Sequence, residues 1–310
     1  MALYLVTGGA GFIGSNIARA LAIRGDRVRV FDNFVTGRRE NLADLPEVEV
    51  VEGDVRDSDA LRSAMAQVDR VLHQAALPGV PRSVQDPVTS NESNLTGTLN
   101  VLIAARDAGV KRVVCASSSS VYGDTPTLPK VETMAPRPIS PYAVTKLTGE
   151  LYCTVFHQLY GLEAVALRYF NVFGPHQDPL SDYAAVIPLF IAAMTRAERP
   201  RVEGDGTQSR DFTFVDNVVQ ANLRAAQASG VTGEVFNVAC GQRYTLLDLV
   251  DRLNRILGTR LEPRFGEARA GDVKHSLADI DKARRLLGYE PSVSFDEGLE
   301  RTVAWHRRRS

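Results

Sequence analysis

The chain contains little cysteine, no excess of one charge and no long hydrophobic run. Its three cysteines, Cys115, Cys153 and Cys240, are far apart and lack CxxC spacing, which argues against a disulfide framework and against a zinc or other metal site. We interpret them as buried thiols of a protein in the reducing cytoplasm. The 36 basic and 37 acidic residues give a net charge of −1, so no broad electrostatic field attracts nucleic acid or a membrane surface.

The hydrophobic segments are short. No stretch is long and apolar enough to span a bilayer, and the N-terminal run ALYLVTGG lacks the basic region and long apolar core of a secretory signal. The three arginines at 307–309 form a short basic run, which we interpret as a solvated helix end. Hydrophobic residues make up 44% and charged residues 24% of the chain, as is typical of a globular protein.

Short apolar runs alternate with amphipathic segments through the first half of the chain. The predicted strands cover 3–6, 28–31, 48–51, 70–73, 112–117 and 164–169, and the predicted helices between them include 16–25, 59–67 and 94–109. Apolar strands that alternate with helices are typical of a parallel sheet covered on both faces. The sequence therefore predicts an α/β fold with a Rossmann-type, doubly wound parallel sheet.

The pattern changes after about residue 170, where proline and glycine become more frequent and the elements less regular. We predict a dinucleotide-binding Rossmann domain over 1–168, to which 208–230 returns, and a smaller α/β substrate-binding lobe over 169–310. No Gly/Ser-rich or Pro-rich linker separates the two, so we expect them to pack around one cleft.

The segment TGGAGFIG (7–14) follows the first strand and opens the first helix. Gly8 permits a tight turn, Gly11 lets the backbone approach a pyrophosphate, and Gly14 lets helix and strand pack closely. The helix N-terminus offers its free N–H groups to the phosphates. Asp32 ends the second strand, where a carboxylate accepts hydrogen bonds from the adenosine ribose and repels a 2′-phosphate. The pattern indicates NAD rather than NADP; the structural alternative is a plain turn with a capping aspartate.

A further acidic residue, Asp54, follows the third strand in GDVRD (53–57). Asp54 is expected to accept from the adenine amino group, and Val55 to lie against the ring. In a compatible structural role, Asp57 or Ser58 caps the next helix.

Tyr142 and Lys146, in SPYAVTK (140–146), are four residues apart at the start of a predicted helix, so both side chains lie on one face. A nearby ammonium and a nicotinamide cation favour the phenolate, and lowering the tyrosine pKa by about 3 units needs roughly 4 kcal/mol. Such a phenol can act as a base near neutral pH. The serine run that ends the strand at 112–117 places a hydroxyl where ligands bind in this fold. A surface Tyr–Lys pair is the structural alternative.

Seven segments together resemble a known family. They read TGGAGFIG, HQAA (73–76), ASSSSVYG (116–123), SPYAVTK, LRYFNVFGP (167–175), GDGTQSRDFTFVDN (204–217) and RAGDVKHSLAD (269–279). In this order they resemble the extended short-chain dehydrogenase/reductases, and more narrowly the nucleotide-sugar 4-epimerases. The resemblance covers nearly the whole chain.

The resemblance implies the roles of individual residues. Tyr142 is the base, Lys146 binds the nicotinamide ribose, and Ser118 is the hydroxyl partner. The implied NAD pocket comprises Gly8, Gly11, Phe12, Ile13, Gly14, Asp32, Asn33, Asp54, Val55, Ala75, Ala76, Asn94, Tyr142, Lys146 and Tyr169, with Phe170 beside it. The implied UDP-sugar site comprises Ser118, Ser119, Ser120, Asn171, Ala185, Val186, Arg210, Arg269, Asp272 and Ser276. Among these, Asn171, Arg210 and Arg269 hold the diphosphate and Asp272 a ribose.

The resemblance implies an NAD-dependent UDP-sugar 4-epimerase that works through a transient 4-keto sugar. Ser119 and Ser120 stand where 4,6-dehydratases and decarboxylases of the family carry acids, which argues against both. Ser276 and Ala185 are small, so we expect UDP-GlcNAc/UDP-GalNAc to be accepted alongside UDP-Glc/UDP-Gal. UDP-glucuronate is the alternative substrate, with Arg82 as a candidate partner of its carboxylate. A non-catalytic NAD sensor or scaffold is the alternative from a different class.

The resemblance also implies a homodimer through a four-helix bundle. Its helices are those predicted at 94–109 and from Tyr142 onward. The second contains LTGELYCTVFHQLYG, which is apolar on more than one face.

Overall fold

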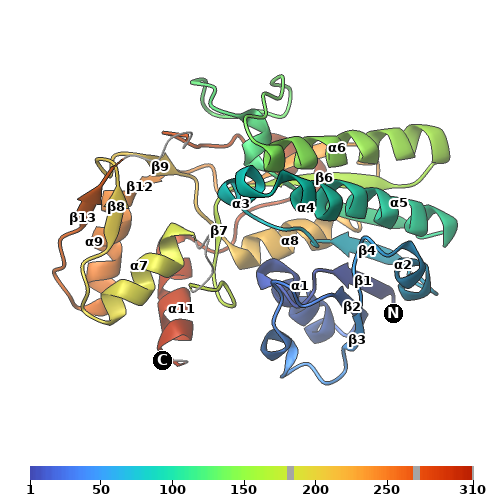
Figure 1. Ribbon diagram of the computed structural model, residues 1–310, viewed down its shortest axis with the longest axis horizontal. Coiled ribbons are helices and arrows are strands. Elements are labelled where there is room, and N and C mark those ends of the chain that lie inside the picture. The colour runs from blue at the N-terminus through green and yellow to red at the C-terminus, as the bar shows by residue number, and fades with distance from the viewer. Residues whose placement is uncertain (180–184, 268–272, 309–310) are drawn as a thin grey trace.

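The computed structural model describes residues 1–179, 185–267 and 273–308. Its centre is a seven-stranded parallel sheet with the strand order β11-β6-β5-β4-β1-β2-β3 (Figure 1). The strands are β1 (Leu3–Thr7), β2 (Arg27–Asp32), β3 (Glu49–Glu52), β4 (Arg70–His73), β5 (Arg112–Ser118), β6 (Ala164–Tyr169) and β11 (Val235–Val238). The first six confirm the strands predicted from apolar runs.

Helices cover both faces of the sheet. On one face lie α2 (Ser58–Ala64), α5 (Gly97–Asp107) and α6 (Pro141–Tyr160), and on the other α1 (Phe12–Ile23), α8 (Val215–Ala225) and α10 (Asp281–Leu287). Each face has its own apolar core, and strand residues such as Leu5 and Val6 contribute to opposite cores because side chains alternate along a strand. The predicted Rossmann-type fold class is confirmed.

The segment before α5 differs from the single helix predicted over 94–109. It consists of α3 (Val80–Gln85), α4 (Pro87–Asn91) and a π-helical turn, η2 (Glu92–Thr96), before α5 begins at Gly97. Two prolines occupy the first turns of α3 and α4, where the missing N–H is tolerated. Asp57 caps α2 by accepting from the backbone N–H groups of Asp59 and Ala60, as the sequence predicts.

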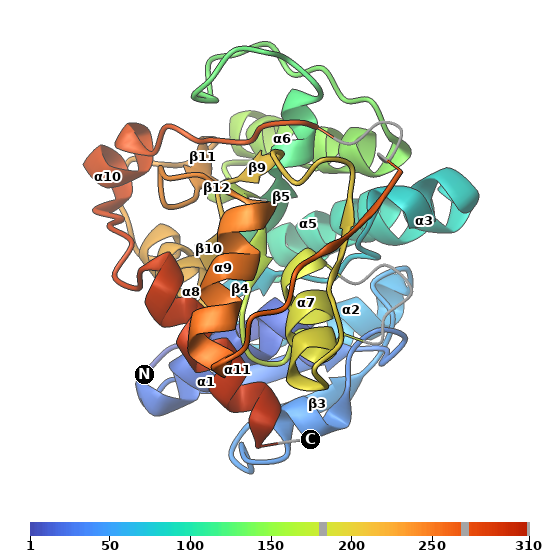
Figure 2. The same ribbon diagram turned by 90° about the vertical axis from the view of Figure 1, so that its left-hand side faces the viewer.

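A smaller group of elements follows β6. Its helices are α7 (Val186–Thr195), α9 (Leu246–Leu257) and α11 (Phe295–Arg307), and its short strands are β7 (Val172–Phe173), β8 (Arg201–Glu203), β9 (Ser209–Arg210), β10 (Thr213–Phe214), β12 (Tyr244–Thr245) and β13 (Arg264–Gly266). A separate cluster of apolar side chains forms its core and includes the packed aromatic rings of Phe173, Phe212 and Phe295. Figure 2 views the molecule from the side where α7, α9 and α11 lie in front of the sheet.

Two arginines at the start of their strands bind the carboxyl end of helix α8 to the sheet. Arg70 begins β4 and Arg112 begins β5, and they are paired in the sheet register. Arg70 Nε donates to Ala226 O at 2.9 Å and Arg112 Nη1 donates to Ala225 O at 2.8 Å. Cations that bind the last carbonyls of a helix complement its dipole. Helix α8 therefore packs on the central sheet, whereas the short strands β9 and β10 before it pair outside that sheet.

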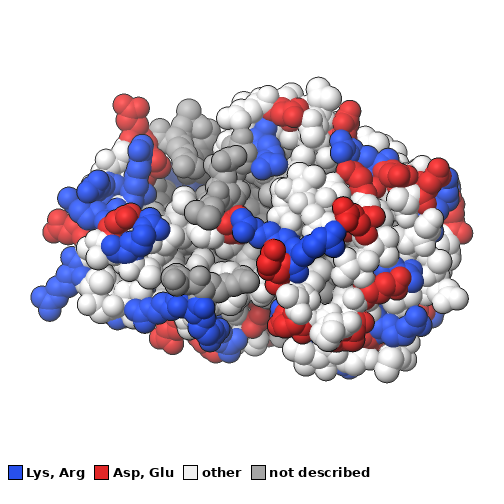
Figure 3. Space-filling model, turned by 60° about the horizontal axis from the view of Figure 1, so that its bottom comes forward, with Lys and Arg blue, Asp and Glu red and all other residues white. Residues whose placement is uncertain are grey.

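The surface carries both charge signs in close mixture, as Figure 3 shows for one face. Many of these residues are paired, for example Arg29 with Glu49 and Arg284 with Glu290. Among the described residues, no helix combines the length and hydrophobicity needed to cross a bilayer.

Candidate active site

A cavity of about 230 Å³ lies at the carboxyl ends of the central strands. The ends of β1, β2, β4 and β5 meet there because the strands are parallel and in register, with Thr7 opposite both Phe31 and His73. Fourteen of the fifteen residues predicted for the NAD pocket line it: Gly8, Gly11, Phe12, Ile13, Gly14, Asp32, Asn33, Asp54, Val55, Ala75, Ala76, Tyr142, Lys146 and Tyr169.

The glycine turn is shaped by close backbone contacts. Gly8 has φ +67°, and a Cβ on it would lie 2.6 Å from Ala75 N. A Cβ on Gly14 would lie 2.1 Å from Gly8 O, so only glycine lets α1 start this close to β1. No side chain caps α1 at Gly11. The N–H groups of the first turn are therefore free to bind phosphate oxygens, and the turn fits a dinucleotide.

Asp32 is buried at the end of β2, with 7% of its surface exposed. Its oxygens accept from Ala10 N at 2.9 Å and Phe34 N at 2.8 Å, which leaves further lone pairs for a ribose hydroxyl. Burial raises the pKa of this carboxyl, and the two backbone donors oppose that effect. Two arginines lie near Asp32 in the sequence, and each is paired with another carboxylate: Arg38 with Asp178 and Arg39 with Glu52.

Asp54 is held by two neighbours at the edge of the cavity. It accepts from Asn33 Nδ2 at 2.8 Å and from Arg56 Nη2 at 2.8 Å. Mainly because of the hydrogen bond from Arg56, the pKa of Asp54 falls to about 2. The carboxylate is thus charged at neutral pH and suited to accept from an amino group.

Asn94 is the predicted pocket residue that does not line the cavity. Its amide instead accepts from Leu77 N at 2.7 Å and donates to Leu77 O at 3.0 Å, and Leu77 forms part of the wall. The role of Asn94 in this structure is therefore to shape the wall.

Behind that wall, a buried imidazole connects three elements. Thr98 Oγ1 donates to Asn94 O at 2.6 Å, so it must accept from His73 Nε2 at 2.9 Å. His73 Nδ1 then accepts from Thr7 Oγ1 at 2.7 Å, which fixes the Nε2–H tautomer. Burial lowers the pKa of His73 to about 3, so the ring is neutral at ordinary pH.

Tyr142 and Lys146 project from the first turns of α6, which Ser140 caps and Pro141 begins. The Ser118 hydroxyl at the end of β5 lies beside the Tyr142 phenol, where it favours the phenolate and so acts to lower the pKa of Tyr142. Lys146 Nζ lies 5.9 Å from the centre of the Tyr142 ring and donates to Ala116 O at 2.9 Å. The predicted Ser–Tyr–Lys constellation therefore assembles at one end of the cavity.

The pKa values at this site differ from the sequence-based expectation. Burial raises the pKa of Tyr142, the hydrogen bond with Ser118 opposes this, and Lys146 is not among the causes. Burial also lowers the pKa of Lys146 to about 8. The protein's own groups thus do not make the phenol acidic, and the expected lowering would depend on the positive charge of the nicotinamide.

Three of the residues predicted to bind the substrate lie together beyond the cavity. Arg210 Nη1 donates to Ser209 O at 3.0 Å, and Ser276 N donates to the same oxygen at 3.0 Å. Asn171 Nδ2 donates to Asp211 O at 3.3 Å. Ser119 and Ser120 form the 3₁₀ turn after Ser118, Ala185 and Val186 begin α7, and Arg269 and Asp272 lie outside the described residues.

Comparison with known proteins identifies the family to which this site belongs. Residues 4–239 match the model of the NAD dependent epimerase/dehydratase family, and this range contains both the glycine turn and the Ser–Tyr–Lys constellation. The chain belongs to this family.

Individual relatives of this family member cover nearly its full length. A solved UDP-N-acetylglucosamine 4-epimerase from Methanobrevibacter ruminantium, in complex with UDP-N-acetylmuramic acid, is 41% identical, with a TM-score of 0.95 over 100% of this chain and 99% of that one. The Thermus thermophilus UDP-glucose 4-epimerase, solved with NAD, is 37% identical, with a TM-score of 0.90 over 98% and 99%. A UDP-glucuronate 4-epimerase of Thermodesulfobacterium geofontis is 36% identical over 99% of this chain and 97% of its own length.

These comparisons confirm the family predicted from the motifs, NAD as the cofactor of this family member, and isomerase as its enzyme class. They leave the sugar open, because the relatives differ in it.

Several residues of the cavity were not predicted: Phe31, Thr36, Gly53, Gln74, Leu77, Pro78, Ser93, Ala116 and Ser117. Most of them end a strand or follow one, so the general rule that ligands bind at strand carboxyl ends could have identified them. Gln74 lies in the quoted HQAA segment, and together with Asn222 it fixes the hydroxyl of Tyr169.

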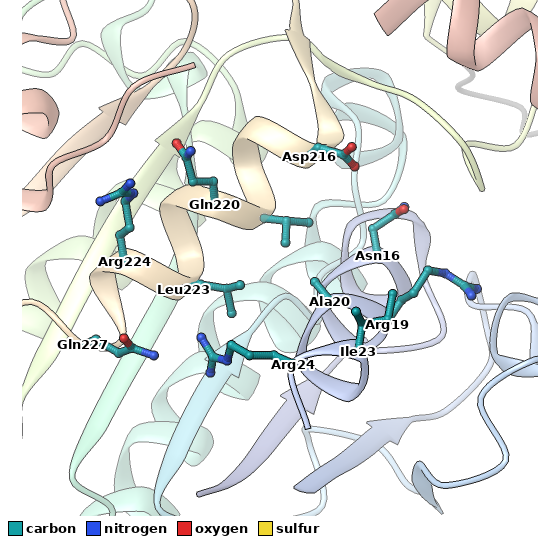
Figure 4. Close-up of a pocket in the computed structure, with 11 residues that line it drawn as sticks. Asn16, Arg19, Ala20, Ile23, Arg24, Asp216, Gln220, Leu223, Arg224 and Gln227 are labelled. Carbon is teal, nitrogen blue, oxygen red and sulfur yellow. The ribbon is translucent and has the colours of Figure 1, made fainter. Parts of the chain in front are cut away.

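A second hollow of about 710 Å³ lies between α1 and α8 on the outer surface (Figure 4). Three of its four charged lining residues are paired with residues outside it: Arg19 pairs with Asp44, Arg24 with Asp26, and Asp216 with Arg301. These three residues therefore do not supply the converging free polar groups that mark a small-molecule site.

Proposed function

We propose that this enzyme interconverts the C4 epimers of UDP-sugars with bound NAD. The observation that carries the proposal is the placement of Ser118 beside the Tyr142 phenol, with Lys146 Nζ 5.9 Å from the centre of that ring and with both Tyr142 and Lys146 lining the dinucleotide cavity. A phenol held there is in a position to take the proton of a sugar hydroxyl.

Each residue of the constellation has a separate task. Tyr142 removes the proton of the sugar 4-hydroxyl and later returns it, and Ser118 holds the oxygen from which the proton moves. Lys146 provides a fixed ammonium that a ribose hydroxyl can bind. Bound NAD would supply a hydride acceptor for C4 and then return the hydride to the opposite face of the 4-keto sugar.

The diphosphate grip is proposed at Arg210 and Asn171, together with Arg269 and with Asp272 at the ribose. A guanidinium binds phosphate oxygens through two parallel hydrogen bonds. Arg210 Nη1 donates to the backbone carbonyls of Ser209 and Lys274, and Ser276 N also donates to Ser209 O, so the guanidinium lies beside Ser276. With UDP anchored, the 4-keto sugar can rotate to present its opposite face without leaving the cleft.

For the sugar, we propose UDP-Glc/UDP-Gal and also UDP-GlcNAc/UDP-GalNAc. The support is the small side chain of Ser276, next to the segment of Arg210, and the small side chain of Ala185 at the start of α7. Similarity to the Methanobrevibacter ruminantium enzyme points in the same direction.

UDP-glucuronate is the second candidate. Arg82 lies on α3, which packs against α6, and Ser83 of α3 accepts from Tyr142 N at 3.0 Å. A cation on this helix is near the start of the catalytic helix, and similarity to the Thermodesulfobacterium geofontis UDP-glucuronate 4-epimerase adds support.

We further propose a cytoplasmic homodimer. The three cysteines are free in the structure, which fits a reducing compartment. The dimer is proposed through α5 and α6, and the outer face of α6 is apolar.

The test uses purified protein incubated separately with UDP-Glc, UDP-GlcNAc and UDP-GlcA, with the epimers separated. We expect turnover of the first two, and a loss of about 10³-fold or more in Tyr142→Phe with NAD still bound. Ser276→Tyr is the substrate variant and should reduce turnover of the acetamido sugar far more than that of the plain hexose.

Three outcomes would count against these proposals. Equal losses for both sugars in Ser276→Tyr contradict the pocket argument, and turnover of UDP-GlcA alone selects the second candidate. Bound NAD without turnover of any UDP-sugar would support a non-catalytic sensor instead.

A further inference from the structure

A carboxylate in the middle of α6 and a guanidinium of β6 are buried between the helix and the sheet. Glu150 and Arg168 expose 4% and 3% of their surfaces. Arg168 Nε and Nη2 donate to the two carboxylate oxygens at 2.8 and 2.7 Å, and the Ser117 hydroxyl donates to the same carboxylate. None of these groups reaches the reacting phenol, so the mechanism above does not use them.

Burying such a pair adds little net stability, because the desolvation of both charges offsets their attraction. What a bidentate pair does provide is direction, since it forms only at one distance and one rotation. Apart from that pair and the hydrogen bonds of Lys146 to Ala116 O and of Thr154 to Gly233 O, α6 packs on the sheet through apolar side chains, for example Cys153 and Phe156. Apolar contacts are non-directional, so they do not by themselves set how far the helix slides along the strands.

Directional contacts of α6 converge on the strand residues next to Ser118. Lys146 donates to Ala116 O, two residues before Ser118, and Glu150 accepts from the hydroxyl of Ser117, one residue before it. On the neighbouring strand Arg168 is paired in register with Ser117, just as Tyr169 is with Ser118. The helix that carries the phenol is therefore fastened to the strand that carries its hydroxyl partner.

The network extends to the far edge of the sheet. The Arg168 guanidinium carbon lies 4.6 Å from the centre of the Tyr122 ring, and Tyr122 Oη donates to Asn237 Oδ1 in β11 at 2.7 Å. Arg168 Nη1 has no hydrogen-bond partner among the described residues, so the guanidinium is held by the carboxylate on one side and by an aromatic face on the other.

We propose that the Glu150–Arg168 pair is a positioning device that holds α6 at the depth and rotation at which the Tyr142 phenol meets the Ser118 hydroxyl. Both are positioning residues, since they act through Tyr142 and Ser118. The effect of this pair on turnover rests on the proposed epimerase function. Its effect on the position of α6 does not depend on that function.

The main test is the double variant Glu150→Leu/Arg168→Met. It replaces the pair with apolar side chains, a change that buried ion pairs often tolerate without loss of folding. Displacement of the phenol by a fraction of an ångström should lower kcat by about 10- to 100-fold, while KM for the UDP-sugar stays within about twofold because the diphosphate grip is untouched.

A second readout does not need turnover. Tyrosine labelled with ¹³C at Cζ reports phenol ionisation by NMR, and Tyr142→Phe identifies the resonance of Tyr142. Loss of the aligned Ser118 hydroxyl should shift the titration midpoint of this resonance upward, because that hydrogen bond favours the phenolate. The single variant Glu150→Gln leaves Arg168 buried and unpaired, so it should show the same changes with a greater loss of folded protein.

Glu163→Gln is the matched control. Glu163 pairs with Arg112 at the opposite end of the same two strands, and Arg112 keeps its bond to Ala225 O when the charge is removed. Its kcat and its Tyr142 titration should equal those of the wild type.

A folded double variant with wild-type kcat and an unchanged Tyr142 titration would overturn the proposal. If instead the wild-type protein turns over no UDP-sugar, the proposed function fails, and the NMR titration alone still decides whether the pair positions the phenol.

Discussion

At the scale of single residues, the buried charge of Lys146 in the candidate site destabilises the folded protein. Lys146 is buried with 8% of its surface exposed and donates a hydrogen bond to Ala116 O. Burial lowers its pKa from 10.5 to about 8. The folded protein therefore holds this proton less tightly than the unfolded chain, and the charged form opposes folding. A buried charge that opposes folding is expected where a residue serves function rather than stability.

We predict that Lys146→Met is inactive but more stable than the wild type at pH 7, by up to about 3 kcal/mol for the shift of roughly 2.5 units. The folded pKa is depressed, so the wild type regains stability as pH rises from about 8 to 10.5. Urea unfolding at about pH 7, 9 and 10.5 should therefore show the difference shrinking with pH.

Lys111→Met is the control for this titration, since Lys111 is exposed and paired with Asp69. It should show no comparable change over the same pH range. A Lys146→Met protein less stable than the wild type throughout would mean that the hydrogen bond to Ala116 outweighs the burial.

At the scale of elements, the glycine turn couples the start of α1 to the end of β1. We predict that Gly14→Ala forces the two apart, since the new Cβ would lie 2.1 Å from Gly8 O. Overpacking of this kind lowers the free energy of unfolding by about 1–3 kcal/mol, and displacement of the α1 N-terminus should weaken NAD binding at least tenfold. Urea unfolding and NAD titration of the apoprotein measure both.

Gly25→Ala, just beyond the other end of α1, separates the two effects. Gly25 has φ +83°, and no atom lies within 4 Å of the place that a Cβ would occupy, so its substitution strains only the backbone, by about 1–2 kcal/mol. NAD affinity should be unchanged there. Equal NAD affinity in Gly14→Ala and the wild type would contradict the role assigned to the turn.

Much of this layout could be predicted from sequence, because apolar strand runs and short motifs are local signals. The strand β11 could not: it has four residues, and its central Asn237 is fully buried. Asn237 is tolerated because it donates to Lys130 O and Asp279 O, which belong to distant segments. The same limit applies to Glu150 and Arg168, whose charges predict exposure until the tertiary structure pairs them.

The substrate residues show this limit more strongly. Asn171, Arg210 and Ser276 come from three separate segments of the chain, which are joined by hydrogen bonds of residues 209–213. No spacing in the sequence encodes that meeting, so a family resemblance was needed to suggest it.

At the scale of the whole molecule, the outer face of α6 is an exposed apolar surface. The family resemblance predicts that this helix takes part in a dimer interface. Val144, Leu151, Val155 and Leu159 are 47, 57, 40 and 69% exposed. Their spacing places them on one side of the helix, opposite the side that packs on the sheet through Cys153 and Phe156. A contiguous apolar face of this kind marks an interaction site.

We predict that the wild type is a dimer at micromolar concentration and that Leu151→Glu/Leu159→Glu is a monomer. The two charges would be desolvated at the centre of the proposed helix bundle but lie in water in the monomer, so folding should be preserved. Sedimentation equilibrium measures the association. Leu286→Glu, on α10 at the other face of the sheet and 40% exposed, is the control and should remain dimeric.

A monomeric wild type would contradict the bundle, as would a Leu151→Glu/Leu159→Glu protein that still dimerises.

The proposed dimer should also affect catalysis, because the apolar outer face belongs to α6, the helix that carries Tyr142 and Glu150. If α6 is held by a partner on one side and by the Glu150–Arg168 pair on the other, monomerisation should lower kcat without changing KM. The change should be smaller than that of the double variant at 150 and 168, since the buried pair still holds the helix on the sheet.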